Sequence, residues 1–352
     1  MTSLFTSFSS NAILAKSRAM YGKRLSTQNY NDLLNCKSVG EIASYLKTRT
    51  FYSDIFEGVT PSAIHRGQLE VLLNKHVFKQ YEILSKYELS IGQDFYKYFI
   101  TRNDIEMILT CVRLLNTGNP EDYLLYMPIF FEEHTGINQF ELSKVRSIND
   151  LLEALNGTEY KGILSPYVKN FDMITGKLSV EAAFNRYKYL KLKELVESGY
   201  KGKRTDQVLE VLKIQNDVRT IINIYRLKKL HGADKELIKR FIIPEVSRMS
   251  VKQLEMLTDT PNAEDMLELL NKTDYGKGLN IPNFEYIEDA AQRYLYKWNL
   301  KSLRFSSNPT VVMFCFIFLL ENEISNVTHI IEGIRYKVST NDLKNILIGI
   351  ED

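Results

Sequence analysis

An Asn followed by an acidic residue recurs within three long segments of this chain whose apolar residues have helical spacing. The three polar pairs are Asn103-Asp104, Asn216-Asp217 and Asn322-Glu323. Asn and Asp disfavour a helix interior by up to about 0.7 kcal/mol each relative to Ala, because their short side chains compete for backbone groups. Recurrence in three helices predicts three equivalent units in which each pair makes the same interhelical hydrogen bonds. Direct contact with a partner protein is the alternative.

A second pattern alternates with the polar pairs. Its copies are SVGEIASYLKTRTFY (38–52), SINDLLEALNGTEY (147–160) and NAEDMLELLNKTDY (262–275). In each copy the first residue is an N-cap type that stands three residues before an acid, as in a capping box. The cap and acid are Ser38 and Glu41, Ser147 and Asp150, and Asn262 and Asp265. We expect three short amphipathic helices, each followed by an aromatic ring at Phe51, Tyr160 or Tyr275.

The spacing of these copies gives the size of the repeat. Phe51 and Tyr160 are 109 residues apart, and Tyr160 and Tyr275 are 115 residues apart. Ordinary solenoid repeats span only about 20–50 residues, so each unit is domain-sized. Turn-forming stretches at 58–61, 162–166 and 276–282 then predict three domains, comprising residues 1–60 plus 283–352, residues 61–165 and residues 166–282.

The pattern of the remaining sequence predicts an all-α fold. Long helices are expected near residues 179–199, 205–231 and 286–298, and strand alternation bounded by hairpin turns is nearly absent. The apolar run 311–320, closed by Glu321, is shorter than the roughly 20 residues that a spanning helix needs. We therefore expect a buried core helix there and no transmembrane segment.

Composition excludes several classes of function. The chain has 352 residues with 45 basic and 43 acidic side chains spread along it, so it has no overall positive field for nucleic acid. Its three cysteines, Cys36, Cys111 and Cys315, are far apart and form no CxxC motif, which argues against a disulfide framework or a zinc site. The N-terminus lacks the pattern of a secretory signal, so an intracellular location is expected.

Motifs of catalysis are also missing from the sequence. There is no GxxxxGK[ST] loop for phosphate and no HExxH pair for zinc. The basic stretch Gly199–Arg204 fails the spacing of a phosphate loop, and we expect Thr205-Asp206 to cap the helix that follows. We predict no catalytic residue, no cofactor and no metal site.

Other residues resemble a known family. Lys16, Arg18, Leu33 and Glu41-Ile42 lie within a segment, Asn11 to Tyr52, that resembles the N-terminal region of the C subunit of bacterial and archaeal V-type (A/V-type) ATPases. That family includes the eukaryotic d subunit. Further matches lie in Asp217 to Gly232 and in Glu321 to Val327, so the resemblance spans nearly the whole chain. The chain departs from the family pattern at Thr328, where Arg is usual, and at Glu245-Val246, which replace a glycine-rich stretch.

The resemblance implies three similar helical domains around a pseudo-threefold axis, arranged as a funnel. It also implies a non-catalytic central-stalk subunit on the cytoplasmic face of the membrane. Such a subunit links the rotating shaft to the membrane rotor ring and couples ATP hydrolysis or synthesis to H⁺ or Na⁺ transport. Basic residues are then candidate contacts with acidic groups of the shaft, namely Lys23, Arg24, Arg226, Lys228 and Lys229. The alternative is a free-standing all-α scaffold that binds soluble partner proteins.

Overall fold

The described part of the chain is built from helices joined by short turns, as expected. The computed structural model describes residues 2–87, 92–169, 171–172, 175–281 and 286–350, and no strand occurs within these ranges. The chain divides into two compact units. Unit 1 comprises Met1–Gly92 and Glu288–Asp352, and unit 2 comprises Gln93–Ile287. Unit 1 thus combines both ends of the chain, whereas the division into three similar domains stays a prediction.

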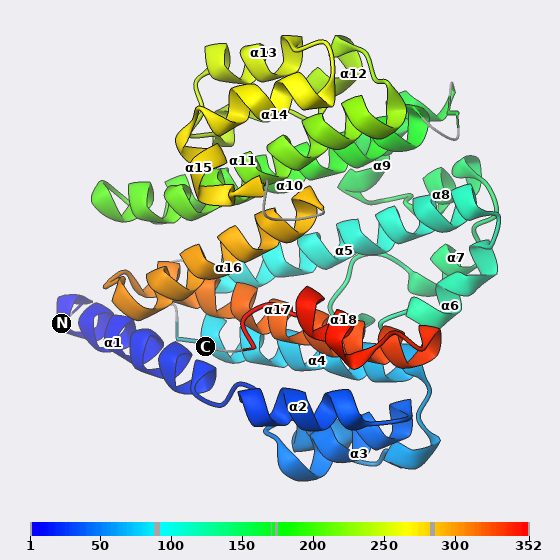
Figure 1. The fold of residues 1–352 in the computed structure, drawn as a ribbon, viewed down its shortest axis with the longest axis vertical. Coiled ribbons are helices and arrows are strands. Elements are labelled where there is room, and N and C mark those ends of the chain that lie inside the picture. Colours follow the sequence, from blue (N-terminus) through cyan, green and yellow to red (C-terminus); the bar gives the residue numbers. More distant parts are fainter. Residues whose placement is uncertain (1, 88–91, 170, 173–174, 282–285, 351–352) are drawn as a thin grey trace. The chain divides into compact units, whose positions relative to one another are not determined.

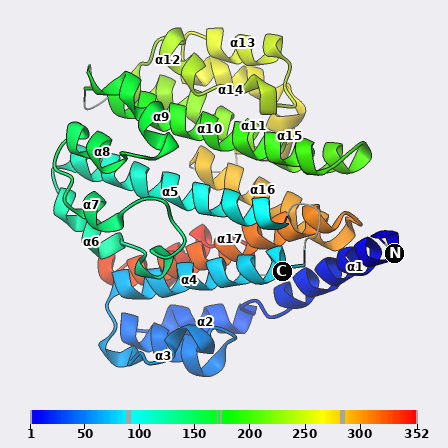
Figure 2. The same cartoon turned by 180° about the vertical axis from the view of Figure 1, so that it is seen from behind.

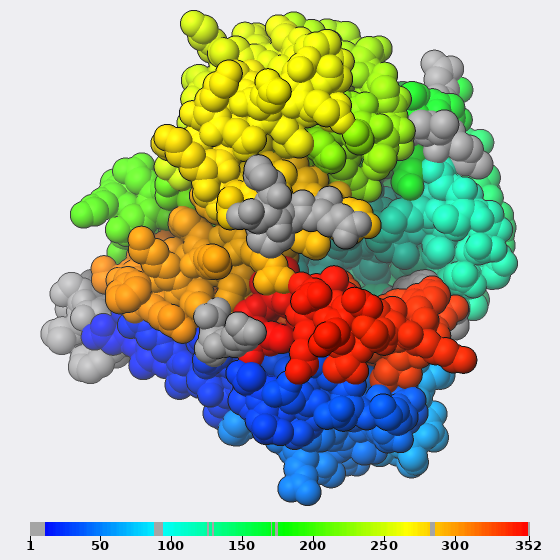
Figure 3. All heavy atoms as spheres, viewed as in Figure 1, coloured from blue at the N-terminus to red at the C-terminus, as the bar shows by residue number. Residues whose placement is uncertain are grey.

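Unit 1 is organised around one long apolar helix, α17. Figure 1 and Figure 2 show α1 and α4 beside α17, and the short helices α2 and α3 also contact it. On the face shown in Figure 3, the C-terminal residues border the N-terminal helices. The elements of unit 1 are α1 (Thr2–Tyr21), α2 (Thr27–Asn35), α3 (Val39–Arg49), η1 (Ser53–Phe56), η2 (Pro61–Ala63), α4 (Arg66–Ser85), α16 (Ile287–Phe305), α17 (Pro309–Tyr336) and α18 (Thr340–Ile346).

Helix α17 continues well beyond the apolar run that predicted it. Glu321 does not end the helix, and Asn322 and Glu323 lie near its middle. By length and composition alone this helix could cross a membrane, yet 78% of its most apolar window is buried inside the protein. Burial of this kind is what the core helix of a folded unit requires. The prediction of a buried core helix is therefore confirmed.

Unit 2 is organised around the long helices α10 and α11, which pack against each other (Figure 2). Helix α11 also packs on α14, and α10 packs on α9 and α12. The elements of unit 2 are α5 (Gly92–Thr117), η3 (Pro120–Asp122), α6 (Tyr123–Tyr126), η4 (Ile129–Phe131), α7 (Gln139–Ser143), α8 (Ile148–Ala154), α9 (Glu159–Val168), α10 (Thr175–Gly199), α11 (Lys203–His231), α12 (Lys235–Arg240), η5 (Pro244–Val246), α13 (Val251–Asp259), α14 (Ala263–Asn271) and α15 (Asp274–Leu279).

Three local predictions in unit 2 were wrong, and one is the turn at 276–282, because residues 276–279 lie inside α15 (Asp274–Leu279). The stretch 162–166, expected as a turn, lies inside α9, where Pro166 cannot donate to the Gly162 carbonyl and the Ser165 hydroxyl donates to it instead, at 3.3 Å. Thr205 does not cap α11, because the helix already begins at Lys203. Its N-cap is Gly202, whose φ of +63° favours glycine and turns the chain into the helix.

Candidate functional site

The acid of each polar pair is buried and accepts a hydrogen bond from a tyrosine. Asp104, Asp217 and Glu323 are 3%, 0% and 7% exposed. The three bonds, each from hydroxyl to carboxylate, are Tyr160 to Asp104 (2.9 Å), Tyr275 to Asp217 (2.7 Å) and Tyr52 to Glu323 (2.6 Å). In the sequence, Asp104 and Tyr160 are 56 positions apart, and Asp217 and Tyr275 are 58 positions apart. The third bond joins the N-terminal and C-terminal parts of the chain. Each bond ties a long helix to the segment that follows a short capped helix.

A second donor reaches each carboxylate from the turn that precedes another short helix. The Thr135 hydroxyl donates to Asp104, and the Ser247 hydroxyl donates to Asp217. Each hydroxyl in turn accepts from the backbone N–H two residues later, at 3.0 Å in both cases. Glu323 has one more methylene and instead accepts from the Leu25 backbone N–H at 2.8 Å. These donors satisfy buried acceptors that would otherwise be costly.

Burial changes the acidity of all three carboxyls. Loss of hydration raises the pKa of Asp104 from 3.8 to about 6 and that of Glu323 from 4.5 to about 7, although the tyrosine hydrogen bonds oppose the change. The pKa of Asp217 is raised for the same reason. Asp217 has three donors, since the Arg248 backbone N–H also reaches it at 2.9 Å. The three acids therefore share a buried, hydrogen-bonded position and a raised pKa.

The asparagines of the pairs behave less uniformly than the acids. Asn216 donates to the carbonyls of Ile243 and Val246 at 3.2 and 2.7 Å. Asn322 donates to the Ile348 carbonyl at 3.1 Å, so in both cases the amide holds a distant loop. Asn103 is only half-buried and donates to the Phe99 carbonyl of its own helix at 2.8 Å, in place of the interhelical hydrogen bond that was expected.

The three short helices begin where the sequence pattern placed them. Ser38, Ser147 and Asn262 each accept from the backbone N–H three residues later, at 3.2, 3.1 and 2.8 Å. In a capping box the acid accepts a hydrogen bond from the backbone N–H of the N-cap residue itself. Glu41 and Asp150 instead accept from the backbone N–H of the residue that precedes the N-cap. Asp265 accepts from the Asn262 side chain. In all three copies the cap and the acid therefore act together at the start of the helix.

The aromatic residue of the first copy was assigned one position too early. Phe51 is 62% exposed, whereas Tyr52 is 3% exposed and holds Glu323. The partners Thr135 and Ser247 were also missed. They follow their acids by 31 and 30 residues, a spacing that could have revealed them once the repeat was known.

The candidate cations of unit 1 lie at the end of α1 and just after it. Lys23 is exposed, and its Nζ lies 5.1 Å from the centroid of the Phe51 ring. Arg24 is half-buried, and its guanidinium carbon lies 4.5 Å from the centroid of the Tyr21 ring. Both contacts have the geometry of cation–π pairs. Each of the two charged groups thus lies against an aromatic ring.

The candidate cations of unit 2 lie near the C-terminal end of α11. Arg226 is exposed. Lys228 is half-buried and donates to the Thr258 carbonyl at 2.9 Å, at the C-terminal end of α13, where a cation is favourable. Lys229 forms an ion pair with Glu264. Lys228 and Lys229 therefore have partners within their own unit.

No group of three or more His, Cys, Asp or Glu side chains within the described ranges has an arrangement that could hold a metal ion. The three cysteines are free thiols, and burial raises the pKa of Cys111 to about 12. The three buried acids instead hold long helices to distant segments through hydrogen bonds.

Comparison with known proteins gives matches over nearly the full length. The family model described as ATP synthase (C/AC39) subunit matches residues 13–346. The C subunit of the A-type ATP synthase of Methanosarcina mazei is 25% identical over 345 residues, covering 95% of this chain and 91% of that protein. The protein of the same name from Methanocaldococcus jannaschii is 22% identical over 359 residues, covering 96% and 85%. That from Thermococcus kodakarensis is 23% identical over 320 residues, covering 88% and 82%. The resemblance inferred from sequence motifs is thereby confirmed, and the chain belongs to the ATP synthase (C/AC39) subunit family.

Proposed function

We propose that this chain is a non-catalytic central-stalk subunit of a rotary A/V-type ATP synthase. It connects the rotating shaft to the membrane rotor ring at the cytoplasmic face, and so couples ATP hydrolysis or synthesis to H⁺ or Na⁺ transport. The observation that carries this proposal is the family match over residues 13–346, together with relatives named as the C subunit of A-type ATP synthases. Peripheral attachment agrees with the burial of α17, the one helix of the described ranges that is long and apolar enough to cross a membrane.

The buried acids support a mechanical role. A part that transmits torque must not slip internally, and close-packed interiors with satisfied polar networks transmit strain. Three long helices, α5, α11 and α17, each carry a buried carboxylate that holds the segment after a short capped helix. The same anchor in three places also supports the proposal of three similar domains. We expect this repetition to stiffen the protein against twisting.

Deletion of the chain from cells that carry the ATPase tests the role directly. The soluble head should still hydrolyse ATP, whereas ATP-driven ion pumping by membrane vesicles should be lost and should return when the chain is supplied again. Intact pumping in its absence would exclude the stalk role. A free-standing scaffold, the alternative, predicts no effect on either activity.

Contacts with the shaft are best tested at Arg226. Arg226 is exposed near the C-terminal end of α11, so its charge can be reversed without placing a new charge in the core. Arg226→Glu should slow association with the isolated shaft at low salt, because charge complementarity acts mainly on the association rate. Lys201→Glu, an equal charge change at another exposed position of unit 2, is the matched control. Equal association rates for the two variants would count against Arg226.

A further inference from the structure

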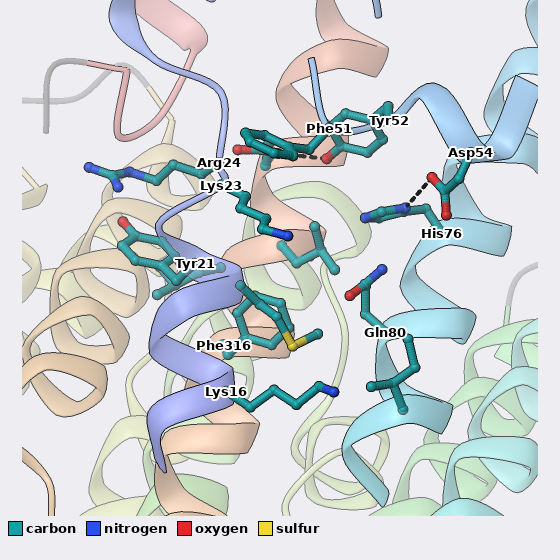
Figure 4. Close-up of a pocket in the computed structure, with 15 residues that line it drawn as sticks. Lys16, Tyr21, Lys23, Arg24, Phe51, Tyr52, Asp54, His76, Gln80 and Phe316 are labelled. Atoms are coloured by element: carbon teal, nitrogen blue, oxygen red, sulfur yellow. Dashed lines mark hydrogen bonds and ion pairs between the residues drawn. The ribbon is translucent and has the colours of Figure 1, made fainter. Parts of the chain in front are cut away.

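Unit 1 contains a cavity of about 310 Å³ between α1, α4 and α17 (Figure 4). Lys16 and Tyr21 of α1 lie on one side, His76 and Gln80 of α4 lie on the other, and Phe316 of α17 contributes to the lining. The volume is at the lower end of the ~300–1,000 Å³ range of small-molecule sites. The proposed linking of shaft to ring makes no use of this cavity.

Two ammonium groups reach the cavity without an acidic partner among the described residues. Lys16 donates to the hydroxyl of Tyr87 at 3.1 Å. Lys23 contacts the Phe51 ring, and Figure 4 shows its side chain directed into the space between α1 and α4. Cations whose contacts are with neutral groups attract an anion.

The two acids of the lining already have partners. Both carboxylate oxygens of Glu323 are occupied, one by the Tyr52 hydroxyl and one by the Leu25 backbone N–H. Asp54 pairs with Lys79 at 2.8 Å. The lining therefore has an excess of positive charge at neutral pH, which favours an anion over a cation.

His76 adds a polar group with unmet hydrogen-bonding capacity. The residue is 9% exposed, and its Nδ1 has no hydrogen-bond partner within the described ranges, the Asp54 carboxylate being 3.8 Å away. Its ring packs on Tyr52 with centroids 4.6 Å apart, and the edge opposite Asp54 faces Lys23 across the cavity (Figure 4). Because Nδ1 lies on the Asp54 side of the ring, the nitrogen on the edge that faces Lys23 is Nε2, which can form a hydrogen bond with a ligand in the cavity.

Apolar side chains form the rest of the lining, so the part of the ligand that contacts them should be apolar. Phe316, Leu319 and Leu320 come from α17, and Phe51 is 62% exposed at the cavity. We propose that this cavity binds a small amphiphilic anion, with a phosphate or carboxylate head at Lys16 and Lys23 and an apolar body against Phe51 and α17. Bound there, such an anion would bridge α1 to α4 and provide a point of regulation.

Isothermal titration calorimetry of the purified full chain with hexyl phosphate tests this site. Three control ligands separate the contributions to binding. Inorganic phosphate has the charged head alone, hexanol has the apolar tail without a charge, and hexylammonium has the same tail with the opposite charge. Hexyl phosphate should bind at least about tenfold more tightly than each of the three, because it alone satisfies both halves of the cavity. Absence of saturable binding, or equal affinity for hexylammonium, would overturn the proposal.

Variants locate the binding. Lys23→Glu should weaken hexyl phosphate binding by about tenfold or more, and Lys23→Met serves as a second variant without charge reversal. Lys75→Glu, exposed on α4 and outside the lining, makes the same charge change and should leave affinity unaltered. Phe51→Ser should weaken binding of hexyl phosphate but not of inorganic phosphate. Equal losses in the Lys23 and Lys75 variants would refute a site in this cavity.

The source of the head group is distinguished by sedimentation with vesicles. Binding to vesicles of phosphatidic acid that is lost in Lys23→Glu would assign the ligand to a lipid, and binding of soluble hexyl phosphate alone would assign it to a small metabolite. All these assays use the isolated chain, so their outcome is independent of the proposed rotary role.

Discussion

At the scale of single residues, the three anchors keep one arrangement with different side chains. Asp104 and Asp217 receive a hydroxyl from Thr135 or Ser247, while the longer Glu323 reaches a backbone N–H. In all three the buried acceptor and the tyrosine donor are present. A polar pair inside an apolar helix is therefore stable because the distant donors offset the cost of burial.

Removing a tyrosine hydroxyl tests this balance. Tyr160→Phe leaves Asp104 with one donor, whereas Tyr275→Phe leaves Asp217 with two. We expect the first variant to lower the free energy of unfolding by about 1–3 kcal/mol and the second by less. Urea denaturation monitored by circular dichroism measures both. Tyr336→Phe, 65% exposed, should change stability by less than about 0.5 kcal/mol. An equal, negligible effect in all three variants would contradict the anchoring role.

The pH dependence of stability should reflect Glu323. Its pKa rises from 4.5 to about 7 on folding because burial disfavours the charged form. Between these values the folded state binds more protons than the unfolded state, so the contribution of this group to stability is greatest below pH 4.5 and falls as pH rises toward 7. That contribution is about 3 kcal/mol at most. Asp104 acts in the same direction, with a pKa of about 6.

Glu323→Gln should flatten this dependence. Unfolding free energies measured by urea denaturation across the pH range will show it, and Glu57→Gln, an exposed change in the same unit, is the control. If Glu323→Gln leaves the slope as steep as in the parent protein, Glu323 is not the group that titrates.

At the scale of elements, each repeat combines a capped helix with the segment that carries its tyrosine. The caps depend on residues only three positions apart, so the sequence pattern located them. After the cap, the copies diverge. Tyr160 and Tyr275 lie in α9 and α15, while Tyr52 precedes the short 3-10 helix η1. The position of the ring is thus kept, although the surrounding helix varies in length.

Two glycines that follow these tyrosines should respond oppositely to alanine. A Cβ on Gly276 would lie 2.1 Å from the Leu270 carbonyl oxygen and 2.5 Å from Asn271 Cα, both backbone atoms that cannot move aside cheaply. Gly276→Ala should therefore destabilise the protein by about 1–3 kcal/mol or more. Gly162, inside α9, has nothing within 4 Å, so Gly162→Ala should stabilise it by about 0.5–1 kcal/mol. Thermal unfolding of both variants measures the difference, and a shift of the same sign in both would contradict the packing around α15.

At the scale of the whole molecule, local patterns could be predicted and long-range ones could not. The helical class, the caps and the unusual polar pairs follow from residues within a few positions of one another. The choice of Tyr52 over Phe51 and the cavity in unit 1 depend on packing between distant segments. Tertiary context overrides local preference at such positions.

Removal of residues 340–352 tests how far unit 1 depends on both chain ends. The Ile348 carbonyl accepts from Asn322 and Asn326 at 3.1 and 2.8 Å, and Leu343 packs beside Gly333 of α17. Without this segment, two buried amides lose a partner, at about 1–3 kcal/mol each. Hydrogen exchange measured by mass spectrometry should show faster exchange in α17 and α2. Each compact unit has its own core, so α11 should keep its protection. Equal loss of protection in α11 would instead show that both units unfold as one cooperative body.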